Sequence, residues 1–227
     1  MSTRQSPRAL SLWAWGCKMG KYQLIYFNVR GRGEAIRLLF SDNGIAYEEI
    51  NCGENWQKDW KHQMQFGQVP ALRDNDLQLV QTNAILRHLG RKHGLYGSND
   101  EEASLIDMIN DGIEDLRVKY LTMIYKNYEN GKDAYIADLP AQLQPFEKLL
   151  AENGADKSGF CVGSKRSFAD YNLFDLLDIN LVLHPKCLEE FPVLDSYYKL
   201  LLARPGIGDH RESESFKQMP INGNGKQ

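Results

Sequence analysis

Hydrophobic and polar positions in the first part of the chain predict short strands separated by helices. Residues 23–27 are rich in strand-forming side chains, and residues 34–40 carry apolar side chains at helical spacing, with Gly44 as a suitable helix stop. Residues 46–50 predict a second strand, and residues 56–64 predict an irregular helical segment. These segments follow one another in the order strand, helix, strand, helix.

A hairpin and a further helix complete this part of the chain. Two short apolar runs, 71–72 and 77–80, are separated by an Asp- and Asn-containing turn sequence, which predicts a hairpin. Residues 83–89 then return to helical spacing. The full order is β-α-β-α-β-β-α, so we expect an α/β thioredoxin-like domain over residues 20–97.

Polar features on both sides of the hairpin are candidate ligand contacts. Gln81 and Thr82 fall at a predicted helix N-terminus, where free backbone N–H groups and the helix dipole favour an anion. Pro70 pushes Val69 into an extended conformation. If the bond between them is cis, Val69 turns its backbone outward to pair with an extended, peptide-like ligand. The alternative is an ordinary edge-strand proline beside an ordinary helix cap, which is the commoner case for such a stretch taken alone.

The pattern changes to helices alone after a Gly-containing linker at 94–100. Leu105, Ile109, Ile113, Leu116, Tyr120 and Ile124 recur at spacings of three and four. This spacing predicts one long amphipathic helix with these side chains on its buried face. Apolar residues between 136 and 150 predict another helix, and Pro140 and Pro145 are expected to kink it.

The last part of the chain is also predicted to be helical. Ser167 and Asp170 have the spacing of a capping box, which opens a helix over 171–182 that is apolar on most sides. That helix is expected to be the buried centre of its domain. A further helix is predicted over 188–202. We therefore expect an all-helical domain over residues 98–227.

Composition and charge exclude several classes of function. The formal net charge of −3 gives no general attraction to nucleic acid or to an anionic membrane. Cysteines and histidines are scattered without metal-ligand spacing, so no metal site is expected. The scattered cysteines and the lack of a convincing signal peptide favour a reducing compartment, and we expect a cytoplasmic protein.

Residues 1–19 differ from the rest of the chain. Basic residues flank a short apolar run, and the segment contains no acidic residue. It is weakly similar to a targeting peptide, but no clear cleavage site follows and the run is too short to span a bilayer. We interpret it as a disordered extension, or as the product of a start codon upstream of Met19.

Several motifs at matching separations resemble the Pi-class cytosolic glutathione S-transferases. They lie at residues 26–32, 67–70, 81–83, 105–117, 167–173 and 220–227. The resemblance implies a thioredoxin-like domain that binds glutathione and a helical domain that completes a pocket for a hydrophobic electrophile. It also implies a homodimeric detoxification enzyme that uses glutathione as co-substrate and needs no cofactor.

The resemblance implies roles for individual residues. Tyr26 would face the glutathione sulfur as the catalytic residue, because a phenol O–H that donates to a thiolate lowers the thiol pKa. The implied glutathione-binding residues are Tyr26, Arg32, Trp56, Lys61, Gln68, Val69, Pro70, Gln81, Thr82 and Asp115 of the partner subunit. The implied electrophile pocket consists of Phe27, Val29, Leu121, Tyr125, Asn222 and Gly223. Without the resemblance, Tyr26 would be a packed strand aromatic, and Arg32 and Lys61 would be surface cations.

Phe66 is a lone large aromatic in a polar connection, with no periodic core to join. We expect it to anchor a homodimer by inserting between helices of the partner, and the alternative is that it folds back onto its own domain. Four features depart from the Pi-class pattern. Met64 replaces a common reactive cysteine, Phe66 replaces the usual tyrosine, Asn28 stands where proline is common, and the polar, weakly patterned residues 206–218 match poorly.

Two hypotheses of different kinds remain. The first is an enzyme that conjugates glutathione to hydrophobic electrophiles. The second is a non-catalytic protein that binds glutathione or another ligand on the same fold, because a fold alone does not fix a function. Tyr26, together with a complete set of peptide-binding residues, favours the enzyme. Thioredoxin-like redox catalysis is excluded, because no cysteine lies in the loop after the first strand.

Overall fold

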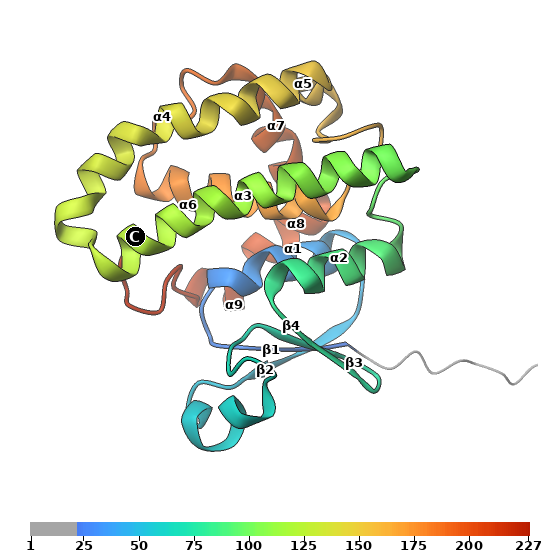
Figure 1. Ribbon diagram of the computed structural model, residues 1–227, viewed down its shortest axis with the longest axis vertical. Coiled ribbons are helices and arrows are strands. Elements are labelled where there is room, and N and C mark those ends of the chain that lie inside the picture. The colour runs from blue at the N-terminus through green and yellow to red at the C-terminus, as the bar shows by residue number, and fades with distance from the viewer. Residues whose placement is uncertain (1–21) are drawn as a thin grey trace, which may run out of the picture.

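The structure, a computed structural model, describes residues 22–227, so the predicted extension at 1–19 lies outside the described residues. Figure 1 shows a small sheet, two helices lying over it, and a larger helical part beyond them. The strands are β1 (Tyr22–Tyr26), β2 (Tyr47–Asn51), β3 (Ala71–Asp74) and β4 (Leu77–Val80). Their order in the sheet is β2-β1-β3-β4, with β2 parallel to β1 and both other pairings antiparallel.

Each face of the sheet packs against a different core, because successive strand residues point to opposite sides. Leu24 and Leu72 join the main core under α1 (Glu34–Asp42) and α2 (Thr82–His93). Ile25 and Ala71 face a smaller core on the opposite side of the sheet. The smaller core is closed by Met64 and by aromatic side chains of the irregular helical segment, which comprises a π-helical turn (Trp56–Trp60) and a 3-10 turn (Lys61–Gln63).

The C-terminal part is built around one buried helix. The helices are α3 (Asp100–Lys126), α4 (Tyr128–Glu152), α5 (Ala155–Ser158), α6 (Phe168–Leu183), α7 (Pro192–Leu202), α8 (Pro205–Glu212) and α9 (Glu214–Gln218). Helix α6 is buried along almost its whole length and packs against α1, α2 and α3. The predicted central helix is therefore confirmed, and through α1 it joins the two parts of the molecule into one core.

The structure corrects the sequence prediction in two places, and it shows helices in a segment for which the sequence predicts no element. Leu105 is 41% exposed, and its neighbour Ile106, at 1%, takes the buried position one turn before Ile109. Helix α7 begins at Pro192 rather than at 188, because a residue that precedes proline is disfavoured in the helical conformation. The weakly patterned segment at 206–218 forms α8 and α9, two short helices whose only buried side chain is Ile207.

The bond between Val69 and Pro70 is cis. None of the helices within residues 22–227 has the length and apolar character needed to cross a membrane. The same residues contain no group of three or more His, Cys, Asp or Glu side chains arranged to hold a metal ion.

Asp170 fixes the start of α6, as the predicted capping box requires. The Ser167 backbone N–H and hydroxyl both donate to Asp170 Oδ2, at 2.6 and 3.0 Å. Its other oxygen, Oδ1, accepts from the Cys161 backbone N–H at 2.8 Å and from the Tyr197 hydroxyl at 2.9 Å. All these groups are buried, so the carboxylate satisfies donors that would otherwise lack partners.

Replacing Asp170 with alanine is expected to destabilise the protein by about 3–5 kcal/mol, since it leaves several buried donors unpaired. Urea unfolding would measure the loss. Asp195→Ala is the matched control, because Asp195 forms only a partly exposed pair with Lys199 at 2.6 Å and should cost about 0.5 kcal/mol or less. Equal losses in the two variants would contradict the structural role of Asp170.

Candidate active site

Tyr26, at the end of β1, is 7% exposed and lies against two glycines of the β1–α1 loop, residues 27–33. A Cβ atom at Gly31 would lie 2.6 Å from the Tyr26 hydroxyl oxygen, and one at Gly33 would lie 2.8 Å from ring atom Cδ1. Both distances are shorter than a side chain tolerates. Gly31 also has φ +42°, a conformation that favours glycine. The two glycines therefore allow the loop to close around the phenol.

The hydroxyl of Tyr26 has a defined orientation. The backbone N–H of Arg32 donates to its oxygen at 2.9 Å, which leaves the phenol hydrogen available for another acceptor. Burial raises the pKa of Tyr26 above its ordinary value and outweighs the opposing hydrogen bond from Arg32. The phenol is therefore protonated at neutral pH and is a hydrogen-bond donor.

A cleft of about 450 Å³ opens next to Tyr26. It is lined by Phe27, Arg32, Trp56, Gly67, Gln68, Val69, Pro70, Gln81, Thr82 and Glu114. Seven of the predicted glutathione-binding residues thus lie around one cleft, although they come from separate parts of the sequence. Of the residues predicted for the electrophile pocket, Phe27 lines this cleft.

Backbone groups supply much of the polar surface of the cleft. Within residues 22–227, neither the N–H nor the C=O of Val69 has a hydrogen-bond partner, so both are available to an extended ligand. Gln81 precedes α2 with φ 74° and provides no side-chain cap to the helix. The first N–H groups of α2 therefore receive no side-chain acceptor from Gln81 and remain available to a ligand. An anion at this end of the cleft would accept from them, as predicted from the sequence.

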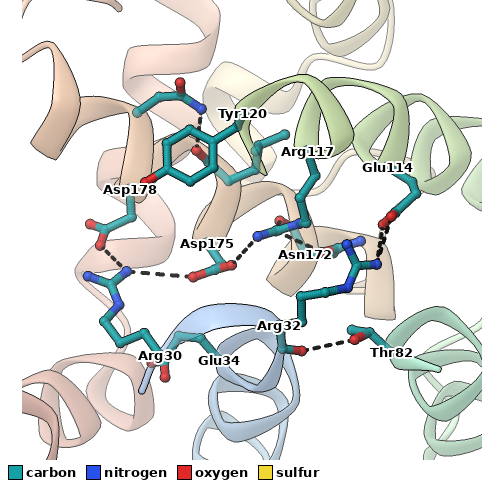
Figure 2. Close-up of polar contacts among 12 residues, drawn as sticks. Arg30, Arg32, Glu34, Thr82, Glu114, Arg117, Tyr120, Asn172, Asp175 and Asp178 are labelled. Atoms are coloured by element: carbon teal, nitrogen blue, oxygen red, sulfur yellow. Dashed lines mark hydrogen bonds and ion pairs between the residues drawn. The ribbon is translucent and has the colours of Figure 1, made fainter. Parts of the chain in front are cut away.

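Glu114, which pairs with Arg32, is a site residue that the sequence did not predict. The Arg32 guanidinium donates to both carboxylate oxygens of Glu114, at 2.7 and 2.8 Å, and the Asn83 amide donates to the same carboxylate at 3.2 Å. Figure 2 shows this pair spanning from the loop to α3, with the Thr82 hydroxyl donating to the Arg32 carbonyl at 3.0 Å. Glu114 lies beside the buried face of α3, and periodicity alone does not distinguish such a position from solvent-exposed ones.

Three predicted glutathione-binding residues do not line the cleft: Tyr26, Lys61 and Asp115. Tyr26 adjoins the cleft through its neighbour Phe27 and its hydrogen-bond partner Arg32, which both line it. Lys61 is exposed, and its side chain runs alongside Gly67 at the edge of the cleft. Asp115 is exposed on α3, next to Glu114 but facing away from the molecule. Its predicted role concerns the glutathione site of the partner subunit, so an exposed position is the one that this role needs.

Other residues predicted for the electrophile pocket gather where the C-terminal segment, residues 220–227, meets α3. The Gly223 backbone N–H donates to the Tyr125 hydroxyl at 3.0 Å. Asn222 is 2% exposed and donates to the Tyr120 hydroxyl at 2.9 Å. Val29 and Leu121 are half-buried.

Two backbone hydrogen bonds bring the C-terminal segment to the β1–α1 loop. The N–H groups of Arg30 and Gly31 donate to the carbonyls of Pro220 and Ile221, each at 2.9 Å. The end of the chain is therefore part of the same site as Tyr26.

Comparison with known proteins decides the family. Residues 22–91 match the N-terminal domain of glutathione S-transferases, and residues 114–214 match the C-terminal domain. The chain is 54% identical to glutathione S-transferase P 1 of Bufo bufo, over 91% of this chain and 99% of that protein. It is 52% identical to glutathione S-transferase P of Homo sapiens, over 92% of this chain and 100% of that protein. The chain belongs to the Pi class of glutathione S-transferases.

A solved structure agrees with this assignment. The Pi-class glutathione S-transferase of Onchocerca volvulus matches with a TM-score of 0.86 and 44% identity, over 92% of this chain and 100% of that one. The predicted family and fold are confirmed. Membership of the family supports a transferase rather than the non-catalytic alternative.

Gly33→Ala should lower the turnover of this transferase about ten- to a hundredfold, because the added methyl group displaces the Tyr26 ring. Gly33 has φ −87°, which alanine adopts without strain, so the effect isolates the contact with the ring. The assay is glutathione conjugation to a chromogenic aryl halide. Gly208→Ala, where nothing lies within 4 Å of the added atom, is the control and should keep full activity. Full activity in Gly33→Ala would contradict the steric argument.

Proposed function

We propose that the protein conjugates reduced glutathione to hydrophobic electrophiles and that Tyr26 activates the thiol. The observation that carries the proposal is the hydrogen bond from the Arg32 N–H to the Tyr26 oxygen, which leaves the phenol proton free beside the cleft. Donation of that proton to the glutathione sulfur stabilises the thiolate and lowers the pKa of the thiol. More of the bound glutathione is then thiolate, the nucleophilic form, near neutral pH.

The polarity of the cleft suits glutathione, which carries two carboxylates and an ammonium group. The N-terminus of α2, with Gln81 and Thr82, would take the γ-glutamyl carboxylate. Val69 would pair through its backbone with the cysteinyl unit, flanked by Gln68 and Pro70. Asp115 of the partner subunit would hold the ammonium group.

The other end of the tripeptide would lie towards the aromatic and cationic side of the cleft. Trp56, Lys61 and Arg32 would surround the glycyl and sulfur end. Since Glu114 already neutralises Arg32, Lys61 is the better candidate partner for the glycyl carboxylate. The electrophile would lie between the cleft and the C-terminal segment, against Phe27, Val29, Leu121, Tyr125, Asn222 and Gly223.

We infer that the working unit is a homodimer. Phe66 is 70% exposed, and an aromatic ring in water forfeits several kcal/mol of burial. A groove of about 210 Å³ between α3 and α4 offers a matching apolar site. It is lined by Leu105, Met108, Ile109, Leu149, Glu152, Asn153, Cys161 and Val162. Phe66 would insert into this groove of the partner subunit.

The three cysteines at 52, 161 and 187 are free and buried, which agrees with the expected cytoplasmic location.

Tyr26→Phe is expected to lower the conjugation rate at neutral pH about 10²–10³-fold while glutathione affinity changes little, because the contacts that hold the peptide lie elsewhere. The rate should recover as pH rises, since the thiol pKa returns towards its ordinary value of about 8.5. Steady-state kinetics as a function of pH measures both effects. Near-full turnover of the variant at neutral pH would exclude Tyr26 as the activator.

Phe66→Ala should shift the dimer towards monomer and weaken glutathione binding, because Asp115 then no longer reaches the neighbouring site. Sedimentation over a range of concentrations measures the shift. Val182→Ala removes another exposed apolar side chain and serves as the control, with no change expected in association. A wild type that is monomeric at micromolar concentration would end the dimer proposal. A loss of stability in Phe66→Ala without dissociation would show that Phe66 packs within its own subunit.

A further inference from the structure

Glu34, the first residue of α1, is a fully buried carboxylate close to Tyr26. Its Oε2 accepts from Nη1 of Arg37 at 3.1 Å, and its Oε1 lies 2.7 Å from Nε2 of His210 on α8. Burial acts to raise the pKa of Glu34, but the hydrogen bond and charge of His210, with the charges of Arg37 and Arg30, outweigh it and lower the pKa to about 2. Because the carboxylate is ionised and only accepts, Nε2 of His210 is the donor in this pair.

Arg37 connects Glu34 to the β1–α1 loop. Its Nη1 also donates to the carbonyls of Val29 and Arg30, at 3.0 and 3.2 Å, and its guanidinium lies 5.8 Å from the centre of the Tyr26 ring. The rest of the guanidinium is held by Glu49 of β2. Arg37 therefore supports the loop from the α1 side, and Glu34 holds Arg37 in place.

His210 connects the same carboxylate to the end of the chain. Its ring packs edge-on against Phe216 of α9, with the ring centres 5.3 Å apart. Phe216 in turn lies under the guanidinium groups of Arg30 and Arg211, at 4.9 and 5.2 Å. Two and three residues after α9 ends, Pro220 and Ile221 accept the two backbone hydrogen bonds from Arg30 and Gly31.

We propose that Glu34 and His210 are positioning residues for the transferase reaction: their hydrogen bond joins the two supports of the β1–α1 loop and so keeps the Arg32 N–H aimed at the Tyr26 oxygen. Neither residue has a hydrogen bond to the Tyr26 hydroxyl, and we assign neither a catalytic role. Both act through Arg37 and the C-terminal segment on the position of the loop. The proposal rests on the proposed role of Tyr26.

The charges around the pair are compatible with this arrangement. Glu34 is faced by Arg37 from α1, by Arg30 from the loop, by His210 from α8 and by Asp175 from α6. Asp178 of α6 pairs with both Arg30 and Arg211, at 2.6 and 2.8 Å. Arg211 follows His210 on α8, so this pair holds α8 against α6. Within residues 22–227, Glu34 has one side-chain hydrogen-bond partner from the C-terminal domain, and that partner is His210.

The test uses two substitutions of similar length at one position. His210→Gln retains an N–H donor close to the place of Nε2, whereas His210→Met fills similar space without a donor. The pH titration of the ultraviolet thiolate absorbance of bound glutathione is measured together with kcat and the KM for glutathione. His210→Met should raise the thiol pKa by about half to one unit and lower kcat at pH 6.5 about three- to tenfold, since one unit corresponds to a tenfold change in thiolate. The KM for glutathione should change less than about twofold, and His210→Gln should restore wild-type behaviour.

Two controls separate this proposal from other causes. Lys217→Met breaks an exposed pair with Glu212 on the same segment and should leave the titration unchanged. Tyr26→Phe should raise the thiol pKa, and adding His210→Met to it should raise the pKa no further. An unchanged titration in His210→Met, or equal shifts in His210→Met and His210→Gln, overturns the positioning proposal even if Tyr26→Phe behaves as expected. No shift in Tyr26→Phe overturns the role of Tyr26 and this proposal together.

Discussion

The guanidinium of Arg30 is buried where the N-terminal domain meets α6, and the relative position of the two domains depends on its ion pairs. It lies 2.6 Å from Asp178 and 3.5 Å from Asp175, and Asp175 also accepts from Arg117 of α3 at 2.8 Å (Figure 2). Charges removed from water cost several kcal/mol each, and the cost is offset only when every partner is in place. Within residues 22–227, Arg30 Nε and Asp175 Oδ1 have no hydrogen-bond partner, so in this arrangement of the loop, α3 and α6 the cost is offset by ion pairing rather than by a complete set of hydrogen bonds. The loop so fixed is the one that surrounds Tyr26.

Backbone geometry at the cleft is specialised on both sides. Gly31 has a backbone conformation that favours glycine, and both Gly31 and Gly33 lack the side chain that would collide with the Tyr26 ring. Gln81, a non-glycine residue, has φ 74°, a conformation that typically costs about 1–3 kcal/mol. The rest of the domain, with its regular sheet and α1 and α2, provides the stability that such a position requires. Strain and tight packing are thus found beside the groups proposed to touch glutathione.

The sequence predicts most of the fold because hydrophobic period and turn chemistry act locally. Tyr22–Tyr26, the hairpin and the capped central helix all follow from patterns within a few residues. Leu105 was assigned wrongly because positions 105 and 106 both fit the helical spacing, and only the packing partners of α3 decide between them. The α8 and α9 helices escaped prediction because they are short and bury almost no apolar surface. Long-range contacts rather than local pattern define them.

The candidate site was predictable to a different degree in each of its parts. The resemblance predicts Gln68, Val69, Gln81 and Thr82, because they occur in recognisable motifs, and all four line the cleft. Glu114 is an acidic residue in a helix rich in charge, and its partner Arg32 is 82 positions away in sequence. His210 and Glu34 are separated by 176 positions. No sequence spacing signals such pairs, because they depend on how α3 and α8 pack against the loop.

The two sides of the site differ in how much they depend on side chains. The side proposed to bind glutathione presents the backbone of Val69 and the N-terminus of α2, which many sequences can supply once the fold is formed. The opposite side is made by the end of the chain, held to the loop by the carbonyls of Pro220 and Ile221. These contacts use backbone atoms, so residues 206–218 can diverge from the Pi-class pattern while the chain end keeps its position. What must be retained is a connection between residues 206–218 and the domain core, and here polar pairs from α8 to the buried carboxylates of Glu34 and Asp178 provide it.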